Sequence, residues 1–220
     1  MTPPSHPSQG PELAPRSERK CAAILAAATE IFLRGGYLGT NMDEIAALSG
    51  VSKQTVYKHF TSKEALFIAV VGEMTGATGD RVHNEPDIAD GQSLQDYLEA
   101  YAYRQLRIVL TPRVMQLRRL VIGEVSRFPD LAQVLYTRGP LRAMTALADV
   151  FSRLAARGLL VLDDPMRAAS HFNWLVMSQA INQAMLLGDD GIPSDAELRR
   201  DAAEGVRVFL AAYGAPPPRT

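Results

Sequence analysis

The sequence predicts an all-α protein with a small N-terminal helical domain and a larger C-terminal one. Apolar residues recur at three- and four-residue spacing along most of the chain, and no segment keeps the alternation of a half-buried strand. Capping residues and helix-opening prolines separate these periodic segments. With 220 residues and 47% hydrophobic content, the chain can bury one good core or two small ones. We therefore expect nearly all of it to be helical.

Composition divides the chain into four segments. The first fifteen residues hold five prolines among small polar residues, and they predict a disordered arm because they cannot bury apolar surface. Three predicted helices follow, then a longer helical region and a short disordered tail. The predicted segments are 1–15, 16–62, 63–213 and 214–220.

The first predicted helix runs from about Ser17 to Arg34. Its apolar stripe, at helical spacing, consists of Ile24, Leu25, Ala28, Ile31 and Phe32. Cys21 lies on the same helix, and we expect it to be a small packed residue rather than a reactive thiol, since free cysteines are usually buried. As the single cysteine, it excludes an internal disulfide and a multi-cysteine metal site.

Two short helical patterns joined by a tight turn lie between Thr40 and Lys63. Thr40 is the predicted N-cap of the first, and Asp43 answers it three residues later in a capping box. Gly50 supplies the positive φ that ends this helix, and Ser52 caps the second. The residues predicted to face the core are Met42, Ile45, Ala46, Leu48 and Val51. This succession predicts a helix-turn-helix.

The second of these helices has one apolar face and one polar face. Val56 and Phe60, four residues apart, are predicted to face inward. The residues left to face outward are Lys53, Gln54, Thr55, Tyr57, Lys58 and His59. A solvated helix face normally mixes acids with bases, yet the sequence from Ser52 to Lys63 contains no carboxylate. Phosphate is therefore the expected partner.

Charge is divided unevenly along the chain. From Arg16 to Lys63 seven bases face four acids, a net +3, whereas from Glu64 to Thr220 sixteen bases face nineteen acids, a net −3. A basic head and an acidic body would orient the molecule on DNA. Three bases at the start of the first helix fit either phosphate contact or ordinary solvation: Arg16, Arg19 and Lys20.

The pattern of the head resembles the N-terminal domain of TetR-family transcriptional regulators over roughly Arg16 to Val71. An alanine-rich helix ending at Gly35, Gly36 and Tyr37 precedes the other matching residues, which are Met42, Ile45, Ala46, Gly50, Val51, Ser52, Tyr57, His59, Phe60, Lys63, Glu64 and Leu66. The resemblance implies an all-helical homodimeric repressor of operator DNA. Residues 16–62 would form the helix-turn-helix DNA-binding domain, and residues 63–213 the helical domain that binds a small-molecule effector and dimerises.

A dimer of this kind implies a palindrome-like operator, because its two recognition helices must enter major grooves one or more DNA turns apart. Lys53, Gln54, Thr55 and Lys58 are the candidates for base edges, since amide and cationic side chains pair with purines there. The resemblance assigns phosphate contacts to Tyr57, His59, Lys63 and Thr40, and Ser52 joins the candidate DNA-binding residues at the start of the helix. For His59, packing against the domain's own core is an alternative.

The C-terminal region is predicted to contain a series of capped helices. A second capping box, Thr61–Glu64, opens a helix to about Asp80, and its first amides with Lys63 offer a phosphate anchor. After a linker at about 80–92, the predicted helices are Ser93–Leu110, Thr111–Arg127 opened by Pro112, and Leu131–Arg157 bent at Gly139 and Pro140. The segment from Leu117 to Leu131 also resembles the AefR-like C-terminal subclass of the family.

The last two predicted helices carry wide apolar stripes. One is capped by Asp164, opened by Pro165 and ends at Leu187 before Gly188; a capping box of Ser194 and Glu197 opens the other. The stripes are Met166, Ala169, Phe172, Val176, Ala180, Ala184 and Leu187, then Leu198, Ala202, Val206, Phe209, Leu210 and Tyr213. The resemblance makes these helices, at about 164–187 and 194–213, the dimer seam. Packing inside one monomer is the alternative, because amphipathicity does not separate a core from an interface.

A mostly apolar cavity between helices is the default place for an effector. The predicted lining is Met115, Leu117, Arg118, Ile122, Met144, Trp174 and Met177, which favours a hydrophobic or amphipathic ligand. Gap filling in the core is the alternative for the methionines, and the dimer seam is the alternative for Trp174. Polar residues on the penultimate helix are expected to face outward or to bond across an interface: His171, Asn173, Gln179 and Asn182.

Enzyme classes find no support in the sequence. It lacks a glycine-rich phosphate loop, a His-Glu-x-x-His pair and a nucleophile elbow, so we expect no catalytic residues, metal or cofactor. The start of the chain has no apolar core like that of a signal peptide, and no run of eighteen apolar residues occurs. We therefore expect a cytoplasmic protein without a membrane partner. An activator, or a regulator that has lost its ligand response, remains an alternative to the repressor.

Overall fold

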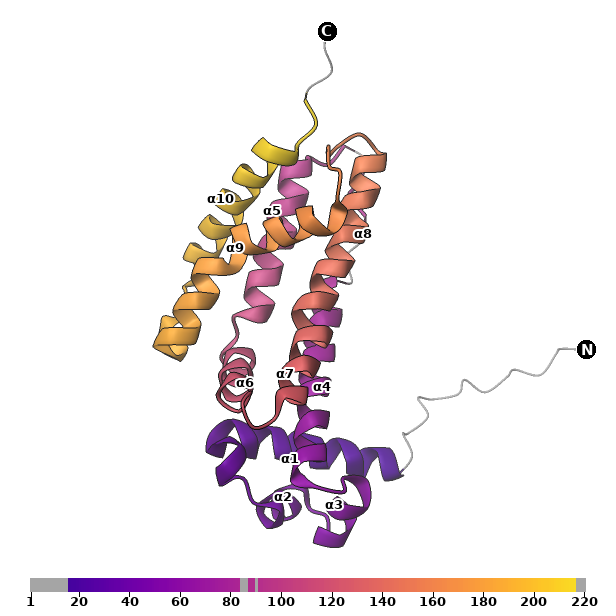
Figure 1. Cartoon of the computed structure of the whole chain (residues 1–220), viewed down its shortest axis with the longest axis vertical. Coiled ribbons are helices and arrows are strands. Elements are labelled where there is room, and N and C mark those ends of the chain that lie inside the picture. The colour runs from indigo at the N-terminus through magenta and orange to yellow at the C-terminus, as the bar shows by residue number, and fades with distance from the viewer. Residues whose placement is uncertain (1–15, 84–86, 90, 217–220) are drawn as a thin grey trace, which may run out of the picture. The chain divides into compact units, whose positions relative to one another are not determined.

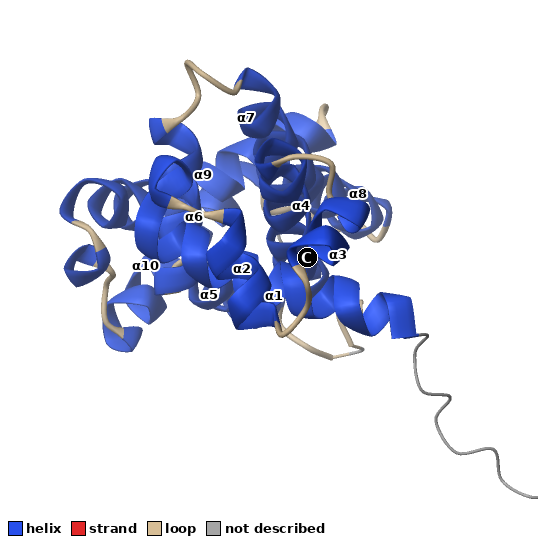
Figure 2. Cartoon of the chain, turned by 90° about the horizontal axis from the view of Figure 1, so that it is seen from below, coloured by secondary structure: helices blue, strands red, loops and turns tan. Residues whose placement is uncertain are grey.

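The structure is a computed structural model, and it describes residues 16–83, 87–89 and 91–216. Within these ranges it confirms the all-α class, with one isolated β-bridge between Leu160 and Gly214 (Figure 2). The predicted arm, 1–15, lies outside the described residues. In chain order the elements labelled in Figure 1 begin with α1 (Arg16–Gly39), α2 (Met42–Ser49), α3 (Lys53–His59), α4 (Lys63–His83), α5 (Leu94–Val109) and α6 (Pro112–Gly123). The chain continues with α7 (Pro129–Tyr136), α8 (Arg142–Ala156), α9 (Pro165–Leu187) and α10 (Asp195–Tyr213), and with two short elements that Figure 1 does not label, η1 (Thr137–Leu141) and η2 (Asp189–Gly191).

The chain divides into two compact units, Met1–Phe67 and Ile68–Thr220, and the division falls inside α4. In unit 1 an aromatic group joins α1 to the start of α4: the Phe32 and Phe67 ring centroids are 4.6 Å apart, and those of Tyr37 and Phe67 are 5.2 Å apart. The apolar stripe predicted for the first helix is buried at Ile24, Ala28, Ile31 and Phe32, and half-buried at Leu25. These contacts form the core of unit 1.

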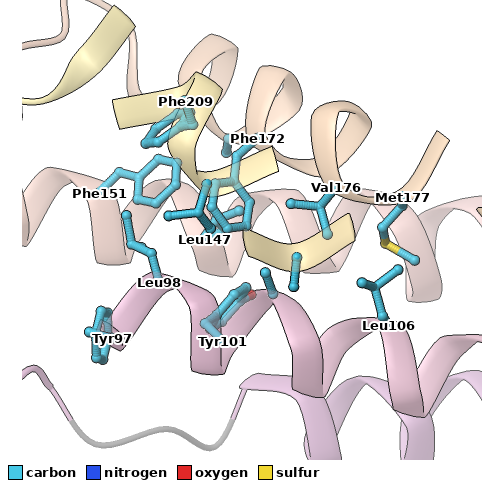
Figure 3. Packing of buried hydrophobic residues seen from close by; sticks show 14 of the residues in the cluster. Tyr97, Leu98, Tyr101, Leu106, Leu147, Phe151, Phe172, Val176, Met177 and Phe209 are labelled. Carbon is cyan, nitrogen blue, oxygen red and sulfur yellow. The ribbon is translucent and has the colours of Figure 1, made fainter. Parts of the chain in front are cut away.

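In unit 2, α5, α8, α9 and α10 enclose a second aromatic cluster (Figure 3). Phe172 of α9 lies at its centre, with its ring centroid 5.2 Å from that of Phe209 on α10 and 5.5 Å from that of Phe151 on α8. Tyr101 of α5 meets the same ring edge-on at 6.1 Å. Edge-to-face rings place the positive edge of one over the negative face of the next, which favours this geometry over a face-to-face stack.

Most predicted helix starts in unit 2 are confirmed. The side chains of Ser93, Thr111, Asp164 and Ser194 each accept a hydrogen bond from a backbone amide of the following turn, and the Ser194–Glu197 capping box is complete. The predicted end of the helix opened by Pro112 is wrong. This helix, α6, ends at Gly123 rather than Arg127, and the Phe128 backbone is non-helical (φ −131°, ψ 71°), as expected for a residue before proline, which avoids the helical region.

The bend predicted near Gly139 and Pro140 is a short π-helix, η1, between α7 and α8. Proline has no amide to donate and its ring crowds the carbonyl one turn earlier, so the chain widens locally and continues without a break. A single wide turn of this kind is a frequent feature of functional sites.

Backbone hydrogen bonds hold the chain just after α10. The Ala215 amide donates to the Leu159 carbonyl at 3.1 Å, and the Val161 amide donates to the Tyr213 carbonyl at 2.8 Å. Disorder from residue 214 onward was therefore a wrong prediction for its first residues; residues 217–220 lie outside the described part. The predicted linker at 80–92 is helical as far as His83, and residues 84–86 and 90 are not described.

One described helix, α1, is long and apolar enough by composition to cross a membrane, with a mean hydropathy of 1.3 over its most apolar window. Ile24, Ala28 and Phe32 of this helix have no exposed surface at all, because they pack in the core of unit 1. A buried core helix passes the same compositional test as a membrane span.

Candidate nucleic-acid interface and ligand cavity

A tight glycine turn joins α2 to α3. Gly50 is left-handed (φ 68°, ψ 21°), and its amide donates to the carbonyls of Ala46 and Ala47. Ser52 then caps α3, because its side chain accepts from the Thr55 amide at 3.2 Å. Val56 is completely buried in unit 1. The glycine turn and the buried Val56 side chain together fix the orientation of α3 in unit 1.

The cap of α2 is Asn41 rather than the predicted Thr40. The Asn41 side chain accepts from the Asp43 amide at 2.9 Å, whereas the Thr40 hydroxyl donates to the Gly36 carbonyl at 2.7 Å. Thr40 is only 5% exposed, so its hydroxyl closes the end of α1 and does not face solvent. Asparagine and threonine both cap helices well, and the sequence Thr-Asn leaves the choice open.

The face of α3 opposite Val56 is polar and accessible. Its exposed residues are Lys53, Gln54, Tyr57 and Lys58, and Ser52 before it is exposed too. Thr55 is half-buried, and its hydroxyl lies 2.8 Å from the Ser52 hydroxyl. His59 is half-buried, with its ring centroid 6.4 Å from that of Phe60. Phe60, predicted to face inward, is also only half-buried.

An ion pair that the sequence did not predict links α3 to α2. The Lys53 ammonium lies 2.7 Å from the Asp43 carboxylate, and both side chains are 57% exposed. The hydrogen bond and the charge of Asp43 raise the pKa of Lys53. Two residues that turn their side chains toward each other from neighbouring helices cannot be identified from spacing within either helix.

Lys63, at the start of α4, is held within unit 1. Its ammonium donates to the Thr40 carbonyl at 3.0 Å and lies 4.7 Å from the centre of the Tyr37 ring. The N-cap of this helix is Ser62, which accepts from the Ala65 amide at 3.0 Å, so Thr61 was the wrong choice. Lys63 therefore ties the end of α1 to the first turn of α4.

Unit 2 contains a cavity of about 80 Å³. Its lining comes from α4, α5, α6, α7, η1, α8 and α9, and consists of Met74, Thr75, Thr78, Gln105, Val109, Val114, Leu117, Arg118, Leu135, Gly139, Pro140, Ala143, Asn173, Trp174, Met177 and Ile181. A mostly apolar wall with a few polar groups is typical of a small-molecule site.

Four of the seven residues predicted to line an effector site do line this cavity: Leu117, Arg118, Trp174 and Met177. Two others lie outside its lining: Met115, which is fully buried in the core cluster, and Ile122, which is 54% exposed. Met144 is half-buried but lies outside the lining, whereas its neighbour Ala143 is part of it. One helical position decides which of two adjacent residues faces a cavity, and sequence periodicity does not resolve it.

Two buried amides meet at the cavity wall. The Gln105 amide nitrogen donates to the Asn173 amide oxygen at 3.0 Å, and the two residues are 3% and 8% exposed. Asn173 therefore faces inward, contrary to the expectation that it points outward or to an interface. The Gln105 amide oxygen is buried and accepts no hydrogen bond from the described residues. The sequence signal was a glutamine in the buried stripe of α5.

The stripes predicted as the dimer seam are mostly core of the monomer. On α9 the buried members are Ala169, Phe172, Val176, Ala180 and Ala184, and on α10 they are Leu198, Ala202, Val206 and Phe209. Gly205 allows α10 to approach α9, since a β-carbon there would lie 2.9 Å from the Val176 side chain. Met166 and Leu187 are exposed. The alternative of packing within the monomer therefore holds for most of both stripes.

Large apolar residues of these helices, including Leu187 of the predicted stripe, are also exposed and are called here the exposed apolar face. They are Trp174, Leu175, Leu186 and Leu187 on α9 and Val208 on α10, with exposed fractions of 37–74%. Trp174 is 50% exposed and also lines the cavity. Trp174 therefore borders the cavity and keeps half of its surface exposed.

Together, unit 1 defines a helix-turn-helix DNA-binding domain and unit 2 a helical domain with an internal cavity. Two family models match the chain: the one for bacterial regulatory proteins of the tetR family matches residues 24–70, and the one for the C-terminal domain of AefR-like transcriptional repressors matches residues 96–215. The chain belongs to the TetR family of transcriptional regulators, which is a non-enzymatic family.

Solved structures resemble the chain over nearly its whole length. A TetR-family transcriptional regulator of Mesorhizobium loti is 38% identical with a TM-score of 0.86, covering 91% of this chain and 100% of that one. The flavonoid-responsive regulator FrrA is 30% identical with a TM-score of 0.74, covering 92% and 100%. The transcriptional activator FasR of Mycolicibacterium smegmatis is 49% identical over 57 residues, only 26% of either chain.

Proposed function

We propose that the protein is a homodimeric repressor that binds a palindrome-like operator through α3 and is released by a small hydrophobic or amphipathic effector in the cavity of unit 2. The observation that supports the DNA-binding part of this proposal is the polar, exposed face of α3. Gln54, Tyr57 and Lys58 are exposed there, and the sequence from Ser52 to Lys63 has no carboxylate that would repel phosphate.

Individual contacts follow from exposure and chemistry. Gln54, Lys58 and Lys53 have side chains suited to purine edges in the major groove. The Thr55 hydroxyl is already engaged with the Ser52 hydroxyl, so Thr55 contributes less. Phosphate contacts are assigned to Tyr57, His59 and Lys63 with the exposed Ser52, and the buried Thr40 side chain no longer belongs among them.

We assign the dimer seam to the exposed apolar face of α9 and α10. Leu186 and Leu187 are 74% and 66% exposed in one chain, and large apolar side chains in contiguous exposure mark interaction surfaces. The double substitution Leu186→Glu with Leu187→Glu should convert a dimer into monomers in sedimentation velocity, because it would bury carboxylates. Leu38→Glu, at a 67% exposed leucine of unit 1, is the matched control. Dimers that persist in the double variant would refute this seam.

An effector would act through α4 and η1. Met74, Thr75 and Thr78 of α4 line the cavity opposite Gly139 and Pro140 of η1, and α4 is continuous with Lys63 in unit 1. A ligand that widens the cavity displaces α4 and so changes the separation of the two DNA-binding domains. The ligand must prefer one of two states, since equal affinity for both shifts nothing. An effector that binds tightly yet leaves operator affinity unchanged would refute this coupling.

The DNA-binding proposal is tested by selecting genomic fragments with purified protein and titrating the best fragment by anisotropy at several salt concentrations. A palindromic site with a steep salt dependence is expected, and Tyr57→Ala should weaken it. Tyr136→Ala is the matched control, since Tyr136 of α7 is 50% exposed and Tyr57 43%. If no fragment is enriched even by protein refolded free of ligand, the operator proposal fails.

Activation of transcription is the second candidate, because the helix-turn-helix matches FasR, a transcriptional activator. A reporter gene behind the selected fragment decides between the two: deleting the regulator should raise expression under a repressor and lower it under an activator. Either role places the protein in the cytoplasm with the DNA.

A further inference from the structure

The cavity of unit 2 contains one charged residue among its described lining residues, Arg118. The adjacent Arg119 shows how this protein pairs a guanidinium: it donates to the Ala184 carbonyl at 2.8 Å and forms an ion pair with Asp189. Arg118 forms no ion pair or hydrogen bond with any described residue. Arg118 is half-buried, and burial lowers its pKa because desolvation disfavours the charged form.

A second polar group at the same wall is also unsatisfied. The Gln105 amide oxygen is buried and accepts no hydrogen bond from the described residues, while the amide nitrogen of the same side chain is taken by Asn173. An unsatisfied buried acceptor costs free energy comparable to a lost hydrogen bond, and a half-buried cation without a protein partner loses part of its hydration. A ligand that binds both groups would explain why two polar groups without a protein partner face the same cavity.

We propose that the cavity binds a small amphipathic acid, whose carboxylate pairs with Arg118 and whose hydroxyl donates to the Gln105 amide oxygen. The apolar remainder would lie against Val109, Leu117 and Ile181. This inference rests on the proposed function, because it specifies the chemistry of the same effector. Arginine suits the role, since its planar fork matches the two oxygens of a carboxylate.

The size of the cavity limits the acid to a small one. A volume of about 80 Å³ is below the range of about 300–1,000 Å³ for pockets that hold drug-sized ligands. Met74 and Met177 in the wall can re-pack around a guest, because methionine is unbranched and flexible. Binding thus requires the wall to move, and part of that wall is α4.

The test uses the full chain without DNA. Four acids, two with and two without a hydroxyl, vary the hydroxyl, and their carboxamides replace the carboxylate with a neutral group. Benzoate, 4-hydroxybenzoate, hexanoate and 6-hydroxyhexanoate are titrated by calorimetry beside their four carboxamides. The acids should bind at least about tenfold more tightly than the amides, as expected for a hydrogen-bonded charge. In Arg118→Met this preference should disappear, while Arg113→Met, at an exposed arginine of the same helix, should keep it. No binding by any acid, or equal binding of acids and amides, overturns the assignment.

The hydroxyl is tested by Gln105→Met. Wild type should prefer each hydroxylated acid over its parent by about fivefold, the worth of one neutral hydrogen bond, and the variant should show no such preference. An unchanged preference in Gln105→Met refutes the role of this amide while leaving that of Arg118 intact.

The unliganded protein provides a readout that needs no ligand. If Arg118 is kept for binding, Arg118→Met should raise the melting temperature by about 2–4 °C, since an apolar side chain replaces a half-buried charge that has no protein partner. A lower melting temperature would show that Arg118 is structural and overturn the proposal. Operator binding with no acid binding refutes only this inference, whereas acid binding that leaves operator affinity unchanged refutes only effector release.

Discussion

Lys53, the first residue of α3, forms a 2.7 Å ion pair with Asp43 in the first turn of α2. The pair directs one of the basic groups of the recognition helix toward its own domain, so DNA must compete with a carboxylate for this ammonium. If α3 contacts DNA as proposed, this competition weakens the contribution of Lys53 to binding.

Removing the carboxylate should strengthen DNA binding. We expect Asp43→Asn to raise operator affinity about two- to fivefold at low salt, in line with the small free energy of an exposed ion pair, when measured by anisotropy. Glu44→Gln is the control, because Glu44 is paired with Arg34 of α1 instead. The gain should vanish in a Lys53→Met background, and its persistence there would show that Asp43 acts by general repulsion.

Residues of α3 that contact base edges and residues that contact phosphate should change DNA binding differently when they are substituted. Gln54→Ala should reduce discrimination at one base pair by about 1–3 kcal/mol, while Tyr57→Phe should weaken all sequences alike. Both side chains are exposed on the same helix, so each controls for the other. Affinities for the operator and its single-base variants measure the effect, and a uniform loss in Gln54→Ala would assign Gln54 to phosphate.

The turn between α2 and α3 depends on Gly50. Gly50→Ala should destabilise unit 1 by about 1–2 kcal/mol, because a left-handed backbone is unfavourable for an L residue with a β-carbon, and Gly50→Asn should cost less. Space is not the reason, since a β-carbon at Gly50 would meet no atom within 4 Å. Gly39→Ala, in equally open space without a positive φ, is the control. Hydrogen exchange of the α3 amides reports the loss, and equal effects of alanine and asparagine would contradict it.

Close approach of α9 and α10 depends on Gly205. A β-carbon there would lie 2.9 Å from the Val176 side chain and 3.2 Å from the Leu175 carbonyl, so Gly205→Ala should cost about 1–3 kcal/mol by overpacking. Gly76→Ala in α4 is the opposite case: nothing lies within 4 Å, and alanine should stabilise that helix by about 0.5–1 kcal/mol. Thermal unfolding of both variants measures the change in stability of each, and the two changes must have opposite signs.

Asp189 should contribute a pH-dependent share of stability. Hydrogen bonds from Arg119 and Gln116 lower the pKa of this carboxyl below its ordinary 3.8. The contribution is therefore complete above about pH 3.8 and is lost as the pH falls through the lower folded-state pKa. Asp189→Asn should lose about 0.2–1 kcal/mol at pH 7, as for a solvated ion pair, and nothing at pH 2. Denaturant unfolding at both pH values checks this, with the exposed neighbour Asp190→Asn as control.

Helix starts were predicted well because their signals are local. A cap and the amide that it accepts lie within one turn, and the turn glycine and opening prolines act on their own backbone. Thr40 and Thr61 failed because another capping residue, Asn41 or Ser62, follows each of them directly. Where two capping residues are adjacent, tertiary packing decides which of them caps the helix. The packing of the Thr40 side chain against the end of α1 cannot be predicted from the sequence.

Contacts between distant segments could not be predicted from the sequence, because they too depend on tertiary packing. The pairing of Gln105 with Asn173 joins residues 68 positions apart, whereas the sequence led us to expect Asn173 to face outward or an interface. The stripes of α9 and α10 were recognised as apolar faces, yet the sequence did not distinguish the core of one chain from a surface between two chains. Which of Ala143 and Met144 lines the cavity likewise depends on a rotation that only packing fixes.

Trp174 is the single tryptophan of the chain, and it borders both the cavity and the exposed apolar face of α9. Indole emission shifts to shorter wavelength when water leaves the ring, so the molecule has a built-in optical reporter. Dilution through dimer dissociation should shift the emission to longer wavelength, and titration with a cavity ligand should quench or shift it at constant protein concentration. One unlabelled sample can therefore report subunit assembly and ligand occupancy as separate signals.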